Sequence, residues 1–442
     1  MKYFSTNGKA DAASLEQAVI KGLAPDKGLY MPECIRTLPQ EFFENIDCMT
    51  LQEISYRVAT AFFGEEIPAD ELKRIVYETM NFEIPAVKVT DDIYSLELFH
   101  GPTLAFKDVG ARFMARMLGY FVKNSNKRVN VLVATSGDTG SAVANGFLGV
   151  ENINVYVLYP KGKVSEIQEK QFTTLGKNIT AIEVDGCFDD CQALVKQAFM
   201  DEELNEEMFL TSANSINLAR FLPQSFYYFW AYAQLKKMGR EKELTISVPS
   251  GNFGNLTAGL FAKRMGLPVK RFVAANNSND IVYNYLQTGE YSPKASVSTI
   301  ANAMDVGAPS NFARIMHLYG NSHREVCKEI SGATYSDAQI AGGVKECLQD
   351  NSYLLDPHGA CGYLALKELL QPGETGVFLE TAHPAKFKDT IEGITGEEIE
   401  IPQALQQFMS GTKESVQIDK NFGTLKSYLL NEEQSENDKF YN

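Results

Sequence analysis

The sequence predicts an α/β protein made of two doubly wound α/β domains preceded by a helical N-terminal domain. From residue 129 onward, short runs of continuously apolar residues alternate with segments of helical length, and the alternation resumes at residue 243. Such runs are typical of parallel strands that are covered by helices on both faces. The chain has 442 residues, whereas a single hydrophobic core stops growing at roughly 250–300 residues. We therefore expect three domains, over residues 1–95, 96–240 and 241–442.

The N-terminal domain is expected to be mainly helical. Ser14 followed by Gln17, and Thr50 followed by Glu53, match the capping box, in which the two side chains satisfy free N–H groups at a helix start. A third helix is expected directly after Pro68. The stretch APDKGLYMPE, rich in Pro and Gly, should form a loop between the first two helices.

The two α/β domains are expected to contain at least six strands. A long aromatic segment, residues 217–239, is a helix candidate that we place near the junction of the two domains. Residues 277–312 are rich in Asn, Ser and Gly and should form loops and short helices, and the chain is expected to end in a polar tail. The expected strands lie at 129–135, 154–160, 178–184, 243–250, 270–276 and 375–380.

Composition excludes several functional classes. A net charge of −15 argues against a nucleic acid or an anionic membrane as the main partner, and no stretch approaches the roughly 20 apolar residues of a membrane span. The N-terminal residues lack the pattern of a signal or transit peptide, which favours the cytoplasm. The seven cysteines are scattered and odd in number, which fits reduced thiols better than disulfides or a zinc site. We expect no metal.

Two Gly-rich turns follow expected strands at the places where open α/β sheets bind ligands. There the free N–H groups of the next helix point at the bound molecule. The first turn, TSGDTG at 135–140, offers hydroxyls and backbone donors that suit a carboxylate or another small oxyanion. The second, SGNFGN at 250–255, has two glycines and no lysine, so a phosphate bound there would be neutralised by amide dipoles alone.

Neither turn has a nucleotide-binding fingerprint. The chain contains no GxxxxGK[ST] motif, and GNFG provides GxxG instead of GxGxxG. Interpretations as a dehydrogenase or a nucleoside triphosphatase therefore lose their usual support. Each turn taken alone is also explained by conformation, because Gly and Asn are common between a strand and a helix.

Lys107 stands at the entry of an amphipathic helix, directly behind the apolar stretch TLAF. Most lysines are solvated. A lysine in a partly desolvated pocket, however, has a lowered pKa and an amine that can act as a nucleophile. An amine nucleophile together with a phosphate-binding turn indicates pyridoxal 5′-phosphate, bound as a Schiff base. We expect Asp108 to be the N-cap of this helix and residues 100–102 to form the turn that aims the lysine.

A third candidate element is the strand that ends at Glu380 and Thr381. A hydroxyl at this place could meet a heteroaromatic nitrogen. Unlike a carboxylate, it would not keep a pyridine protonated. Considered alone, Thr381 is simply a β-branched residue of a strand.

Four motifs occur in an order that strongly resembles the threonine synthase family, in its bacterial and fungal branch. They are HGPTLAFKD, ATSGDTG, SGNFGN and ETAHPAKF. The likeness also covers KYFSTNG and GLAPDKGLYMPE near the start, SANSINLAR in the middle and DPHGA late in the chain, so it spans nearly the whole sequence. It implies the fold of the tryptophan-synthase β-subunit type of pyridoxal-phosphate enzymes, known as fold type II.

The resemblance also implies roles for individual residues. Lys107 would be the Schiff-base lysine, and Thr381 would face the pyridine nitrogen. Asp138 stands where relatives usually have an asparagine that contacts the 3′-oxygen of the cofactor, and a carboxylate there must share a proton or find a cation. The phosphate of the cofactor would be bound by Gly251, Asn252, Phe253, Gly254 and Asn255. Candidates for substrate binding are Thr135, Ser136, Gly137, Thr139, Gly140, Asn214 and Arg220.

The implied activity is that of a carbon–oxygen lyase which converts O-phospho-L-homoserine and water into L-threonine and phosphate, the last step of threonine biosynthesis. Lys107 would carry protons while phosphate leaves Cγ and water adds at Cβ. Two alternatives stay open. One is a related dehydratase or phospholyase acting on an amino-acid phosphate, and the other is a non-catalytic descendant that binds a ligand. We expect a monomer or a homodimer with a small-molecule substrate.

The phosphate of such a substrate needs a cationic or amide-rich pocket of its own. Five cationic side chains are candidates, namely Arg112, Arg116, Lys161, Lys163 and Arg220. Most such side chains only make a surface soluble. His100 and His383 are expected to be structural hydrogen-bonding residues.

Overall fold

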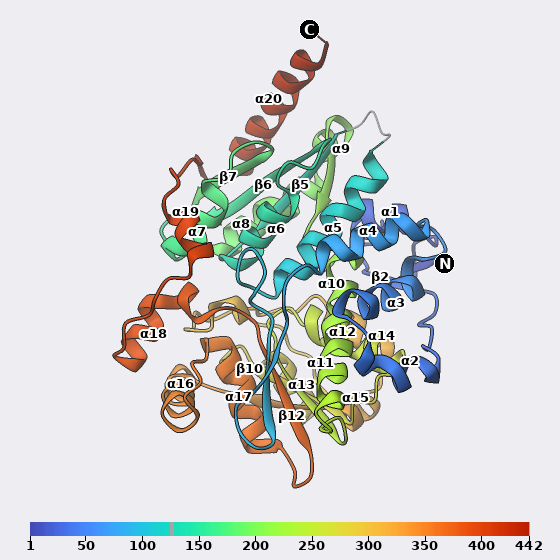
Figure 1. Cartoon of the computed structure of the whole chain (residues 1–442). Helices are drawn as coiled ribbons and strands as arrows, with labels where there is room; N and C mark the ends of the chain where they lie inside the picture. Colours follow the sequence, from blue (N-terminus) through green and yellow to red (C-terminus); the bar gives the residue numbers. More distant parts are fainter. Residues whose placement is uncertain (124–127, 442) are drawn as a thin grey trace.

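The computed structural model, which describes residues 1–123 and 128–441, contains two mainly parallel sheets with helices around them (Figure 1). The larger sheet has the order β11 (Ile330–Thr334), β10 (Arg271–Asn276), β9 (Leu244–Pro249), β12 (Thr375–Glu380), β4 (Ile93–Glu97), β3 (Ala86–Lys88). The smaller has the order β13 (Val416–Asp419), β7 (Ile179–Asp185), β6 (Ile153–Pro160), β5 (Val129–Ala134), β8 (Phe209–Ser212). The expectation of an α/β protein with two sheets is confirmed.

Strand pairing cuts across the expected domain boundaries. β4, which begins at Ile93, pairs in parallel with β12, and β3 pairs antiparallel with β4, so chain before residue 96 belongs to the larger sheet. β13, near the C-terminus, pairs in parallel with β7 of the smaller sheet. Sequence periodicity does not reveal these exchanges because it identifies a strand without identifying its partner.

The central strands are buried along their whole length. Every residue of β5, β9 and β12 is buried, as are all but one of β6. Helices cover both faces of the sheets, which explains why these strands are continuously apolar and do not alternate. The six strands expected from the sequence all form, with ends shifted by at most a few residues.

The N-terminal segment is mainly helical, as expected. α1 (Leu15–Lys21) and α3 (Leu51–Phe63) both start with the expected capping boxes, and α4 (Ala69–Thr79) follows Pro68. The expected loop at 24–33 contains a short strand, β2 (Tyr30–Pro32), that pairs with β1 (Tyr3–Ser5). The N-terminal helices share one hydrophobic core with both sheets, which places them beside α5 in Figure 1.

The long aromatic segment is a broken helix. α10 (Leu218–Phe221) is followed by a 3-10 turn, η2 (Leu222–Gln224), which contains Pro223, and then by α11 (Ser225–Lys237). Proline has no N–H group to donate, so it interrupts a continuous helix here. α11 packs against α3 and α12 (Gly254–Arg264), between the N-terminal helices and the larger sheet.

The C-terminal segment, which is expected to end in a polar tail, is helical. α20 (Phe422–Tyr441) is a helix that packs against α8 (Phe188–Met200), with Leu425 and Leu429 buried, and it extends away from the molecule at the C-terminus (Figure 1). In the part of the chain that the structure describes, no helix is both long enough and apolar enough to cross a membrane.

Candidate active site

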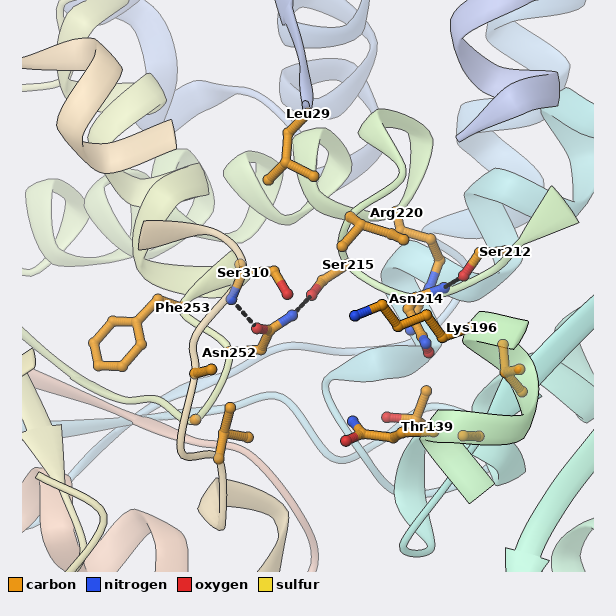
Figure 2. Close-up of a pocket in the computed structure, with 18 of the residues that line it drawn as sticks. Leu29, Thr139, Lys196, Ser212, Asn214, Ser215, Arg220, Asn252, Phe253 and Ser310 are labelled. Carbon is orange, nitrogen blue, oxygen red and sulfur yellow. Dashed lines mark hydrogen bonds between the residues drawn. The ribbon is translucent and has the colours of Figure 1, made fainter. Parts of the chain in front are cut away.

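One cavity of about 1160 Å³ lies where β5, β9 and β12 end. Most of the predicted site residues line it, although they come from distant parts of the chain. Figure 2 shows some of them, among them Thr139, Asn214, Arg220 and Asn252. The predicted residues that line the cavity are Lys107, Thr135, Ser136, Asp138, Thr139, Asn214, Arg220, Gly251, Asn252, Phe253, Gly254, Asn255 and Thr381.

Lys107 is the first residue of α5 (Lys107–Val122) and is half-buried at the wall of the cavity. Burial lowers the pKa of its amine to about 8, although the Asp138 carboxylate acts in the opposite direction. The predicted N-cap role of Asp108 is wrong, because Phe106 holds the cap position. Asp108 is the second residue of the helix, and its carboxylate accepts hydrogen bonds from the backbone N–H and the hydroxyl of Thr103, at 2.9 and 2.7 Å. It therefore fixes the turn that leads into Lys107.

The TSGDTG turn joins β5 to α6 (Asp138–Phe147) and is shaped by Thr135. The Thr135 hydroxyl accepts hydrogen bonds from the backbone N–H groups of Gly137 and Gly140, at 2.9 and 2.8 Å. Gly137 has a φ of +144°, where a side chain is strained, and the structure does not place either glycine at the wall of the cavity. Gly137 and Gly140, which are predicted substrate contacts, thus shape the turn through bonds from their amides to the Thr135 hydroxyl. Ser136, Asp138 and Thr139 face the cavity.

The SGNFGN turn joins β9 to α12 and presents the start of that helix to the cavity. The first N–H groups of a helix have no helical acceptor, and the dipole of the helix favours an anion at this end. Phe253 adopts the left-handed conformation with φ of +59°. The Asn252 amide donates to Ser215 Oγ at 2.7 Å and its oxygen accepts from the Ser310 N–H (Figure 2). These bonds hold the turn from both sides.

Thr381 follows the last residue of β12, and its carbonyl accepts a hydrogen bond from the Phe106 N–H at 2.8 Å. This bond places Thr381 beside the start of α5. Neither His100 nor His383 lines the cavity. His383 caps η4 (Pro384–Phe387) by accepting from the Ala385 N–H, and His100 contacts Glu97 at 2.7 Å, so both are structural, as predicted.

Asp138 has the cation that its position was expected to require. Lys386 of η4 contacts the Asp138 carboxylate at 2.6 Å, and both side chains are almost completely buried. Gln168 of α7 (Glu166–Thr173) donates to the same oxygen at 2.9 Å. Burial alone would raise the pKa of Asp138, but Lys386 and Lys107 together hold it below its ordinary range.

Four of the five cationic candidates for the substrate phosphate lie away from the cavity. Arg112 donates to carbonyls of Glu78 and Thr79, and Arg116 forms an ion pair with Glu78 at 3.0 Å, so both hold α4 against α5. Lys161 and Lys163 are exposed outside the cavity. These four predictions are therefore wrong.

Arg220 is the member of that set that lines the cavity, where it is 3% exposed. Its Nε donates to the Ala213 carbonyl at 2.6 Å and its Nη1 donates to the Lys107 carbonyl at 3.1 Å. Burial lowers its pKa to about 10, which still leaves the guanidinium charged near neutral pH. Asn214 lies next to Arg220 in the cavity (Figure 2).

Sequence reasoning missed several residues of the site. Lys386 and Ser215 stand inside the quoted motifs ETAHPAKF and SANSINLAR, and the unmatched charge of Asp138 was the signal that a cation was needed. Gln168 and Lys196 carry no motif. Lys196, on α8, extends toward the cavity beside Asn214 (Figure 2).

Comparison with known proteins identifies the family. Residues 81–381 match the family of pyridoxal-phosphate-dependent enzymes, residues 2–80 match the threonine synthase N terminus, and residues 359–429 match the threonine synthase C-terminal family. Threonine synthase of Serratia marcescens is 47% identical, with 97% of this chain and 99% of the relative covered. The chain belongs to the threonine synthase family. It is accordingly a pyridoxal-phosphate-dependent enzyme, as the motifs predict.

Solved structures of the threonine synthase family agree with the fold. The crystal structure of the Escherichia coli enzyme has a TM-score of 0.91 and 45% identity, and covers 98% of this chain and 100% of its own. The structure of pyridoxal-phosphate-bound threonine synthase from Brucella melitensis has a TM-score of 0.91 and 35% identity, with 98% and 99% covered. Fold type II is thereby confirmed.

The residues around the cavity fit pyridoxal phosphate. A Cβ atom on Gly251 would lie 2.8 Å from Met304 Cα, and one on Gly254 would lie 2.9 Å from Ser215 Cβ. Only glycine therefore allows residues 251–255, the phosphate cradle, to pack this closely against their neighbours. The cradle offers backbone donors at a helix start for a phosphate. Lys107 offers an amine with a lowered pKa for the aldehyde, and Thr381, beside the start of α5, offers a hydroxyl in the same cavity.

Proposed function

We propose that this threonine synthase family member converts O-phospho-L-homoserine and water into L-threonine and phosphate. In this proposal Lys107 holds the cofactor covalently, residues 251–255 bind its phosphate, and Thr381 faces its ring nitrogen. Ser136 and Thr139, at the start of α6, bind the substrate carboxylate. Asn214 and Arg220 bind the substrate phosphate.

The buried Arg220 guanidinium is the observation that carries the choice of substrate. The cofactor phosphate has a cradle of amide groups at α12, so a cation elsewhere in the same cavity is available for a second phosphate. Arg220 has two of its donors fixed on carbonyls, and the part of the chain that the structure describes supplies no acceptor for its Nη2. A guanidinium held rigidly in a desolvated wall suits a phosphate ester.

The amine of Lys107 is suited to moving protons at the substrate. Bound pyridoxal phosphate withdraws electrons from the substrate, which makes the protons on carbons near its amino group acidic. A base with a pKa of about 8 can both accept and return a proton near neutral pH. Arg220 Nη1 binds the Lys107 carbonyl, so the group that would bind phosphate also fixes the start of α5. The group that we assign to phosphate binding and the group that we assign to proton transfer are thereby fixed relative to each other.

Product analysis tests the proposal directly. Purified protein loaded with pyridoxal phosphate is incubated with O-phospho-L-homoserine, L-threonine or O-phospho-L-threonine in separate reactions. We expect equal amounts of L-threonine and inorganic phosphate from O-phospho-L-homoserine. Ammonia and a 2-keto acid as the main products, from any of the three compounds, would instead identify a dehydratase or a phospholyase.

The Arg220→Gln variant tests the phosphate site. Loss of a charge-assisted contact should raise the KM for O-phospho-L-homoserine roughly tenfold or more, while the visible absorbance of the bound cofactor confirms that Lys107 is still engaged. Lys161→Gln is the matched control, because Lys161 is exposed outside the cavity. An unchanged KM for Arg220→Gln would show that Arg220 does not bind the substrate phosphate.

A further inference from the structure

A buried ion pair joins η4 to α6, and both of its charges act on the Lys107 amine. Lys386 Nζ lies 2.6 Å from Asp138 Oδ1 and donates to the Thr103 carbonyl at 2.8 Å. The side chain of Lys386 is 0% exposed and that of Asp138 is 3% exposed. Burial of a lysine has a desolvation cost that a close partner must offset, so this pair is a specific arrangement and not a chance surface contact.

The fold places Lys386 there by several independent contacts. η4 begins three residues after Thr381, and its cap, His383, accepts from the Ala385 N–H at 3.1 Å. Ser165 Oγ lies 3.4 Å from the Lys386 carbonyl and donates to Gln168 Oε1 at 3.0 Å. Because Gln168 in turn donates to Asp138, the carboxylate is held by one cation and one amide.

Three charged groups act on the Lys107 amine. Asp138 of α6 favours its charged form, whereas Lys386 of η4 and Arg220 of α10 disfavour it. Asp108, on the same helix, is buried, and its pKa is raised by burial. Two cations are thus set against one ionised carboxylate, and that carboxylate is already paired with Lys386. Desolvation is the largest cause of the lowered pKa of Lys107, which is about 8; Asp138 acts against it, and Lys386 and Arg220 act with it.

We propose that Lys386 is a positioning residue that pairs with Asp138 and thereby weakens the hold of this carboxylate on the Lys107 ammonium, so that the amine stays reactive near neutral pH. Lys386 acts through Asp138, and its own nitrogen is engaged by Asp138 and the Thr103 carbonyl. The inference rests on the proposed role of Lys107 as the cofactor lysine. It does not depend on which substrate the enzyme uses.

The test follows the titration of Lys107 in the cofactor-free protein. Trace acetic anhydride labels amines according to their neutral fraction, and peptide mass spectrometry gives the labelling of Lys107 at each pH. We expect Lys386→Met to move the midpoint of Lys107 upward by about one pH unit or more, since an unpaired carboxylate nearby changes the pKa of an ionisable group by about 1–3. Below both midpoints, labelling falls about tenfold for each pH unit.

Asp138→Asn must have the opposite effect. It leaves Lys386 without its partner beside Lys107, so the midpoint should move downward. In the double variant both charges are gone, and the midpoint should return close to that of the original protein. A role of Lys386 in stability alone predicts no such reversal of sign. In the loaded enzyme, the pH at which the visible absorbance of the cofactor changes should move in the same directions.

Lys413→Met is the matched control, because Lys413 pairs with Glu169 and Glu183 at 2.7 Å outside the cavity. It should leave the Lys107 midpoint unchanged. If Lys386→Met does not fold, as judged by circular dichroism, the Asp138→Asn variant decides. An unchanged or raised midpoint in Asp138→Asn, or an unchanged midpoint in a folded Lys386→Met variant, would overturn the proposal. The labelling needs no turnover, so its result tests the role of Lys386 independently of the proposed reaction.

Discussion

Lys107 lowers the stability of the cofactor-free protein because its reactive amine is desolvated. Its pKa is about 8 in the folded chain against 10.5 for an ordinary lysine. The unfolded chain therefore binds more protons between these two values, and stability rises with pH across that window. Below pH 8 the amine is charged in both states, and the full cost of burying its charge lowers the free energy of unfolding. Reactivity toward an aldehyde and the cost to folding have the same physical cause.

Replacing Lys107 with methionine should therefore stabilise the cofactor-free protein. At pH 7 we expect a gain in the free energy of unfolding of up to about 3 kcal/mol, because each pH unit between the two pKa values corresponds to about 1.4 kcal/mol. The gain should shrink as pH rises through 8 and vanish above about 10.5. Urea unfolding of both proteins at pH 7 and at pH 10 measures it. Equal gains at the two pH values would contradict the assignment to charge burial.

The contact between α5 and α10 sets the position of Lys107 at the scale of secondary structure elements. Gly110, one turn into α5, lies against the Arg220 carbonyl so closely that an added Cβ would overlap that backbone oxygen. Arg220 in turn binds the Lys107 carbonyl. The close approach of the two helices therefore aims both the amine and the guanidinium into the cavity.

Gly110→Ala should push the two helices apart, although alanine is the better helix former. We expect a loss of about 1–3 kcal/mol from overpacking and weaker binding of pyridoxal phosphate, measured by urea unfolding and by titration of the visible absorbance. Gly342→Ala in α16 (Asp337–Asn351) is the matched control, because nothing lies within 4 Å of its Cβ position. It should gain about 0.5–1 kcal/mol. Effects of the same sign would refute the overlap argument.

Sequence patterns predict the local features of these elements well, but they predict poorly which elements contact each other. The capping boxes at Ser14 and Thr50 and the strand that ends at Glu380 depend on neighbouring residues, so the sequence reveals them. Lys386 pairs with a residue far away in the sequence, and no periodicity reports such a contact. Asp108 has the right residue type for an N-cap, but its carboxylate binds Thr103 instead, because the turn before the helix folds back onto it.

At the scale of the whole molecule, Arg314 of α14 (Phe312–Leu318) connects three segments that are distant in sequence. Its buried guanidinium donates to the carbonyls of Tyr30 and Ser215, at 3.2 and 3.1 Å, and stacks on the Phe221 ring at 4.1 Å. The N-terminal segment, the segment before α10 and the C-terminal half thus meet at one side chain.

Arg314→Leu should therefore weaken both folding and cofactor binding. The buried carbonyls lose their donor, which costs about 1–3 kcal/mol each, so we expect a loss of about 3 kcal/mol or more in the free energy of unfolding. Ser215, which holds Asn252 of the phosphate cradle, loses its support, so affinity for pyridoxal phosphate should fall as well. Arg324→Leu is the control, because Arg324 is exposed on α15 (His323–Glu329), and its effect should stay within about 0.5 kcal/mol. Urea unfolding and cofactor titration measure both. If Arg314→Leu lowers stability but leaves cofactor affinity intact, then the buried arginine joins the segments of the fold without supporting the cradle.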